Sequence, residues 1–128
     1  MSLNSHRHLI SKAIVKLMTL TQECQLIVLQ LQGPLNLQQG QVLREQIISL
    51  VLQPHHLLAI DLAQVDFMDS SGLAALVTSF STARLSGCRL VICNLQAPIR
   101  MIFELTQLDS QFEIFENYNT VKTTVNTL

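Results

Sequence analysis

Charged residues are scarce in this 128-residue sequence, and no cluster of basic side chains stands out among them. They make up 13% of the chain, and eight basic against nine acidic residues leave a formal net charge of -1. A protein that follows a nucleic-acid backbone needs a positively charged stripe, so we expect no nucleic-acid ligand. Hydrophobic residues, by contrast, reach 48%. That content supplies a core and leaves apolar surface for a protein partner or a homodimer.

Long hydrophobic runs are also missing. A polar or charged residue interrupts every apolar segment before the roughly 20 residues needed to span a bilayer. The opening, MSLNSHRHLISKAIVKLM, has neither a secretory hydrophobic region nor a cleavage site. We therefore expect a cytoplasmic protein with no direct membrane insertion.

Cysteine is too rare for a disulfide framework. Cys24, Cys88 and Cys93 cannot all pair. Cys88 and Cys93 are five positions apart, which places them on opposite faces of a strand. Reduced core residues are a simpler interpretation than a metal site.

The order of hydrophobic periods predicts one α/β domain over residues 15–128, preceded by an N-terminal arm, 1–14, that has no clear period. The expected elements are strands at 15–20 and 25–32 joined as a hairpin, a helix at 38–52, a strand at 57–62, a helix ending at Gly87, a strand at 89–95, a helix from Pro98, a short strand at 112–115 and a weak terminal helix. Alternating strands and helices predict a mixed, mainly parallel sheet of four to five strands with helices packed on it. The inward face of the second helix is expected to carry Leu73, Leu76, Val77, Phe80 and Ala83.

A polar stretch interrupts this pattern at VDFMDSSGLAAL, residues 65–76. Its residues Asp69, Ser70, Ser71 and Gly72 come where a buried strand unit hands over to a helix, the edge at which α/β sheets usually present working residues. Helix capping is the simplest explanation, because Asp and Ser are preferred N-cap residues and glycine eases a tight turn. Capping and function are compatible.

The further residues that an enzymatic role of this stretch would require are missing from the sequence. Residues 68–72 read MDSSG, without the glycine two positions before the serine of a G-x-S-x-G elbow, and no histidine follows His56. Asp61, Asp66 and Asp69 have no further metal ligands in view. One glycine without a following lysine does not make a phosphate-binding loop. We expect no enzyme activity, no metal and no cofactor.

The stretch VDFMDSSGLAAL strongly resembles the signature of the STAS domain family, in particular its bacterial anti-sigma factor antagonists. GPLN, residues 33–36, resembles the Gly-x-Leu-Asp turn of that family, and APIRMIFELTQLDSQFEIF resembles its third helix and last strand. The resemblance covers about residues 15–122. It implies that Ser70, the serine directly after the aspartate, is phosphorylated by a partner kinase that is also the anti-sigma factor.

Two departures from the family pattern stand out. Asn36 replaces the aspartate of the Gly-x-Leu-Asp turn, so phosphorylation is expected to be slow, or to use another partner, if that carboxylate assists the kinase. Gln107 stands where the family often has glycine, a change that we expect to alter only a helix end.

The resemblance implies a regulatory switch that binds proteins. The unmodified chain would bind an anti-sigma factor with GHKL-type serine kinase activity and so free a sigma factor; phosphorylated, it would release that partner, and a metal-dependent serine phosphatase would reset it. ATP would belong to the kinase. The partner-binding residues expected from the resemblance are Asn36, Asp69, Ser70, Ser71 and Gly72. The alternative is an unphosphorylated scaffold subunit of a membrane transporter or lipid-transport complex.

Overall fold

A computed structural model describes residues 13–19, 25–50, 52–54 and 56–126. They form a five-stranded sheet in the order β1-β2-β3-β4-β5, in which β1 is antiparallel to β2 and all other neighbours are parallel. The strands are β1 (Ala13–Thr19), β2 (Gln25–Gln32), β3 (His56–Gln64), β4 (Arg89–Cys93) and β5 (Glu113–Phe115). The predicted mixed, mainly parallel sheet is confirmed.

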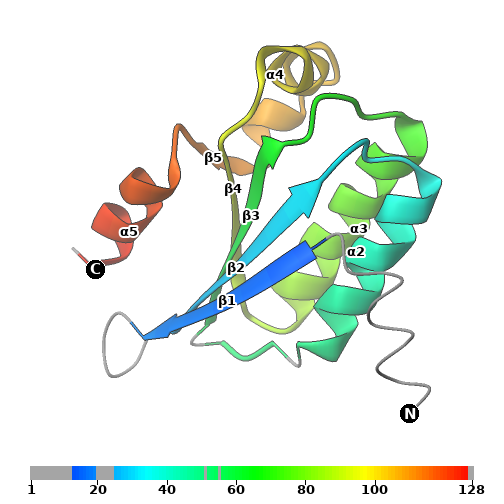
Figure 1. Cartoon of the computed structure of the whole chain (residues 1–128). Coiled ribbons are helices and arrows are strands. Elements are labelled where there is room, and N and C mark those ends of the chain that lie inside the picture. The colour runs from blue at the N-terminus through cyan, green and yellow to red at the C-terminus, as the bar shows by residue number, and fades with distance from the viewer. Residues whose placement is uncertain (1–12, 20–24, 51, 55, 127–128) are drawn as a thin grey trace.

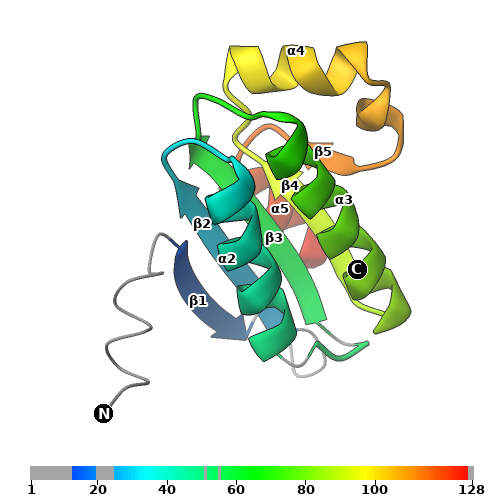
Figure 2. The ribbon, with the colours of Figure 1, turned by 90° about the vertical axis from the view of Figure 1, so that its right-hand side faces the viewer.

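Helices cover the sheet unequally. One face is covered by two neighbouring helices that run side by side, and a single terminal helix lies on the opposite face (Figures 1 and 2). Another helix crosses the edge at which the parallel strands end (Figure 1). In chain order these elements are α2 (Leu37–Ser49), α3 (Ser70–Leu85), α4 (Ala97–Leu105), the 3-10 turn η1 (Leu108–Ser110) and α5 (Tyr118–Asn126).

Strand alternation divides the core into two clusters. In β3, Leu58, Ile60 and Leu62 join the larger cluster beneath α2 and α3, whereas Leu57 and Ala59 join a smaller one. Val121 of α5 belongs to the smaller cluster, so α5 covers that face. Each fully buried aliphatic side chain contributes about 1.5–3 kcal/mol to folding, and the larger cluster therefore holds α2 and α3 against the sheet.

The two described cysteines lie on opposite sides of the sheet, as predicted. Cys88 is buried in the larger cluster and Cys93 in the smaller one. Burial, followed by the negative charge of Asp61, raises the pKa of Cys93 to about 12. Cys24 lies outside the described residues.

Several predicted boundaries are wrong by a few residues. The first strand begins at Ala13, two residues inside the segment predicted as an arm, because its pairing with β2 continues as far as Leu31. The hairpin pairing is confirmed, although its connector lies outside the described residues. His56, predicted in a turn, begins β3, and the strand predicted at 89–95 ends at Cys93.

One face prediction is also wrong. Val77 is 39% exposed, because Leu76 and Phe80 already face the larger cluster and the next position turns outward. The end of α3 agrees with the prediction, since Gly87 takes the left-handed conformation, φ 72°, that terminates a helix. Gln107 is left-handed as well, φ 61°, two residues after the end of α4, so the departure from the family pattern lies at a helix end.

None of the helices among the described residues is long and apolar enough to cross a membrane.

Candidate functional site

Two loops meet at the edge where the parallel strands end. The first follows β2 and leads into α2; the second follows β3 and leads into α3. The amide of Leu35 donates to the carbonyl oxygen of Phe67 (2.9 Å), and the amide of Asp69 donates to the carbonyl oxygen of Leu35 (3.2 Å). Leu35 and Met68 thus form an isolated parallel bridge. The GPLN turn and the serine loop, separated by more than thirty residues in sequence, are one structural unit.

Ser70 occupies the first position of α3 and is exposed. Asp69, in extended conformation, is the N-cap, and its Oδ1 accepts a hydrogen bond from the amide of Gly72 (2.9 Å). The cap fixes the start of the helix, and the helix start fixes Ser70 at the surface. The predicted capping role of Asp69 is confirmed.

Asn36 has the same role in the neighbouring helix. Its Oδ1 accepts a hydrogen bond from the amide of Gln39 (3.1 Å) at the start of α2. Because Asn36 directly follows Leu35, the two N-caps lie on either side of the backbone bridge. The structure thus brings Asn36 and Asp69 together, as the predicted binding set requires.

Gly72 is buried, and its role differs from the predicted easing of a turn. A Cβ built at this position would lie 2.7 Å from the carbonyl carbon of Leu35 and closer still to its oxygen. Only a residue without a side chain lets α3 pass this close to the GPLN turn. Gly72 therefore positions the site and offers no side chain to a partner.

The backbone of Ser71 lies at another close approach, this one between α2 and α3. A Cβ built at Gly40 of α2 would lie 3.5 Å from the carbonyl oxygen of Ser71 and 2.8 Å from the Cβ of Ala75. Ser71 is half-buried, so Ser70 presents the more accessible hydroxyl of the two.

The surroundings of Ser70 combine acid with apolar surface. Asp66 is exposed and Asp69 is half-buried in the same loop. Two large apolar side chains flank the bridged backbone and remain open to solvent, Leu37 at 55% and Phe67 at 54% exposure. Sequence reasoning missed these two as site residues. The sequence indicates them only weakly: each is an apolar residue that lies beside a polar loop and does not fit the periodic pattern of the core.

No group of three or more metal-ligating side chains occurs in the part of the chain that the structure describes. Asp61, Asp66 and Asp69 are not brought together as ligands: Asp61 is buried near the end of β3, Asp66 is exposed, and Asp69 caps α3.

Comparison with known proteins agrees with this arrangement. The family model described as STAS domain matches residues 17–121. The chain belongs to the STAS domain family. The match covers β2, β3, β4, β5, α2, α3 and α4 in full and the end of β1, so both bridged loops are part of the STAS domain.

Solved structures share the fold of this STAS domain at low sequence identity. A candidate anti-sigma factor antagonist from Thermotoga maritima has a TM-score of 0.75 at 17% identity, over 92% of this chain and 97% of that one. The phosphorylated form of SpoIIAA, a Bacillus cell fate determinant, has a TM-score of 0.61 at 19% identity, over 87% of this chain and 99% of that one. At these identities the likeness establishes the fold alone.

A transporter structure also contains the same fold. The murine solute carrier 26 family anion transporter, in its inward-facing state, matches with a TM-score of 0.68 at 15% identity. The match covers 92% of this chain but only 23% of the transporter. The same fold therefore occurs both in small separate chains and as part of a transporter, and fold likeness does not choose between these contexts.

Proposed function

We propose that this STAS domain is a protein-binding regulator switched by phosphorylation of Ser70. The observation that carries the proposal is an exposed hydroxyl at the first position of α3, next to a capping aspartate, on a surface that also exposes Leu37 and Phe67. A partner that covers this surface would bury apolar area and the neutral serine together.

Phosphorylation would change the charge of this surface without destabilising the folded domain. A phosphate adds about -1.5 to -2 charge at pH 7. At the start of α3 the helix dipole and unpaired amides favour an anion, so the scaffold keeps its stability. A docked partner would have to bury that charge beside Asp69, which is unfavourable unless the partner supplies cations.

The partner best supported is an anti-sigma factor with GHKL-type serine kinase activity, bound by unmodified protein and released after phosphorylation. Support comes from the fold shared with anti-sigma factor antagonists and from the placement of Ser70. The chain itself would act without catalysis or cofactor, and a metal-dependent serine phosphatase would restore the hydroxyl. This cycle would take place in the cytoplasm.

Phosphate transfer in the presence of the cognate kinase and ATP tests the proposal directly. We expect one phosphate per chain, absent in Ser70→Ala and retained in the control Ser71→Ala, which removes the neighbouring hydroxyl. Intact-mass measurement with fragment mapping identifies the residue. Transfer to Ser70→Ala at the wild-type rate contradicts the assignment.

A scaffold subunit of a membrane transporter or lipid-transport complex is the second candidate, favoured by the transporter structure that matches over 92% of this chain. In that role the loop surface would bind its partner permanently, and Ser70 would stay unmodified. Affinity capture of unmodified protein from its own cells separates the two. A copurified soluble kinase supports the switch, and a copurified membrane protein supports the scaffold.

A further inference from the structure

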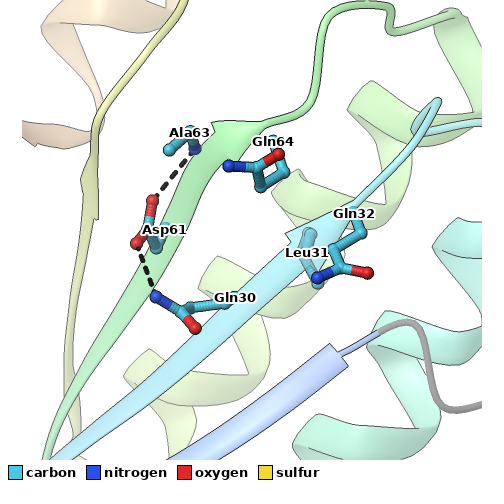
Figure 3. Close-up of a pocket in the computed structure, with 6 residues that line it drawn as sticks. All are labelled: Gln30, Leu31, Gln32, Asp61, Ala63 and Gln64. Carbon is cyan, nitrogen blue, oxygen red and sulfur yellow. Dashed lines mark hydrogen bonds between the residues drawn. The ribbon is translucent and has the colours of Figure 1, made fainter.

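A small polar pocket lies between the carboxyl ends of β2 and β3 (Figure 3). Its volume is about 170 Å³. Leu31 and Asp61 are buried at its base, whereas Gln32, Ala63 and Gln64 form an exposed rim. Gln30 completes the lining. The pocket is thus lined by a buried carboxylate residue and by exposed residues of both strands.

An irregularity in strand pairing creates this opening. Gln30 pairs with Asp61, but the next pair is Gln32 with Gln64, so β3 carries one extra residue there. Such a bulge bends the strand and takes residues out of the ladder. Side chains replace the lost ladder bonds of Ala63: its amide donates to Asp61 Oδ1 (2.9 Å), and its carbonyl oxygen accepts from Gln96 Nε2 (2.7 Å).

Asp61 is only 6% exposed, yet all of its hydrogen-bond donors are neutral. Besides the Ala63 amide, Asn94 Nδ2 donates to Oδ1 (3.0 Å) and Gln30 Nε2 donates to Oδ2 (3.2 Å). Among the residues that the structure describes, Asp61 forms no ion pair. A buried carboxylate without a cation is unfavourable. The negative charge of Asp61 acts on a neighbouring group, since it helps to raise the pKa of Cys93.

The bonding pattern leaves acceptors facing the opening. Oδ1 accepts two hydrogen bonds and Oδ2 only one, and a carboxylate oxygen can accept two. The side chains of Gln32 and Gln64 form no hydrogen bond to another described residue, and their amide oxygens point away from Asp61 (Figure 3). The pocket therefore offers the negative charge of Asp61, and rotation of the two rim amides can add their carbonyl oxygens as acceptors.

The size and the charge of the pocket limit the kinds of ligand that it can bind. Pockets for whole metabolites usually measure about 300–1,000 Å³, so this one admits a single functional group. The Asp61 carboxylate repels anions, and one carboxylate among amides is a poor ligand set for a divalent metal. A small organic cation with several N–H donors satisfies both the charge and the free acceptors.

We propose that this pocket binds one alkylammonium or guanidinium group, with Asp61 Oδ2 as its main acceptor and the rim amide oxygens as secondary ones. The site is separate from the Ser70 hydroxyl and does not depend on the regulatory function proposed above. The cation is either a free small amine or the basic side chain of a protein.

Titration of ¹⁵N-labelled full-length protein with ethylammonium or methylguanidinium chloride tests the site. We expect saturable shifts of the Ala63 amide and of the Gln30 and Asn94 side-chain amides, and none with equal sodium chloride. A short capped peptide with one lysine or arginine is the second arm. At least tenfold tighter binding of the peptide identifies a protein side chain as the ligand, and equal affinity identifies a free amine.

Two variants control for charge and access. Asp61→Asn removes the charge, and rotation of the Gln30 amide restores its hydrogen bond, so we expect at least a tenfold loss of cation affinity. Ala63→Leu fills the opening from the exposed rim and leaves the carboxylate in place, which gives a second test if Asp61→Asn does not fold. Unchanged shifts in both variants, or the same shifts with sodium chloride, overturn the proposal.

Discussion

At Gly72 a single missing side chain allows the two loops of the site to meet. The carbonyl group of Leu35 occupies the space in which a Cβ would stand. That carbonyl oxygen also accepts the amide of Asp69, so it cannot move away without loss of the bridge. The contact is between backbones, and no rotamer change relieves it.

Gly72→Ala should therefore lower the free energy of unfolding by about 3 kcal/mol or more, beyond the usual range for overpacking. Urea denaturation measures the change. Ser70→Ala in the same helical turn is the control and should shift stability by less than about 0.5 kcal/mol, because Ser70 is exposed. A wild-type stability for Gly72→Ala would mean that the loops are not held as described.

At the scale of elements, α2 and α3 begin side by side through matching caps. Asn36 and Asp69 each accept the amide of the third residue of their helix, and the Leu35–Met68 bridge lies between them. The starts of both helices are therefore determined locally by a cap and mutually by the bridge. This pairing holds Asp69, the residue before Ser70, against the GPLN turn.

Two substitutions at Asn36 distinguish the effect of its capping bond on stability from the effect of a negative charge on phosphorylation. Asn36→Ala should destabilise the protein by about 1 kcal/mol through loss of the cap, whereas Asn36→Asp keeps the cap and should leave stability nearly unchanged. If the family carboxylate assists phosphate transfer, Asn36→Asp should also speed phosphorylation of Ser70. Thermal melts and initial transfer rates measure the two effects, and an equal loss of stability in both variants contradicts the capping role.

The whole molecule presents two unlike faces, one covered by α2 and α3 and the other by α5 (Figure 1). The second face holds the smaller cluster and includes the buried thiol of Cys93. Its pKa rises from 9.0 to about 12 on folding, mainly through burial and secondarily through the charge of Asp61. The folded state thus holds this proton more tightly than the unfolded state.

Folding stability should fall in alkali as a result. The contribution of Cys93 is fully present below about pH 9 and is lost between about pH 9 and 12, at most about 1.4 kcal/mol per pH unit. Cys93→Ala lacks this proton and should show a shallower decline across the same window. Denaturant titrations of both proteins from pH 8 to pH 11 give the comparison. Parallel curves would show that the thiol does not titrate as described.

A dianion at Ser70 should affect association far more than the fold. Ser70→Asp carries less charge than a phosphate, yet it places a carboxylate at the start of α3, where the dipole favours it. We expect a melting temperature close to wild type and an affinity for the kinase partner weaker by about a hundredfold, or about 3 kcal/mol. Calorimetry measures both quantities, and Ser70→Asn is the neutral control. Equal affinities of the Asp and Asn variants would remove the electrostatic argument.

Local patterns in the sequence determined much of this protein. Short apolar runs predicted the strands, the stop at Gly87 predicted the end of α3, and the Asp-Ser-Ser order predicted the cap at Asp69, because each depends on residues close together in the chain. The resemblance to the STAS family added Ser70 as the modified residue, which remains a prediction.

Only the tertiary structure decided what distant segments do to one another. The Leu35–Met68 bridge, the close passage of Gly72 and the bulge that opens the pocket at Asp61 each join segments about thirty residues or more apart. The exposure of Val77 likewise depends on how α3 is rotated against the sheet. Periodicity identifies a hydrophobic side of a helix, but its rotation and the register between strands are decided by packing across the whole core.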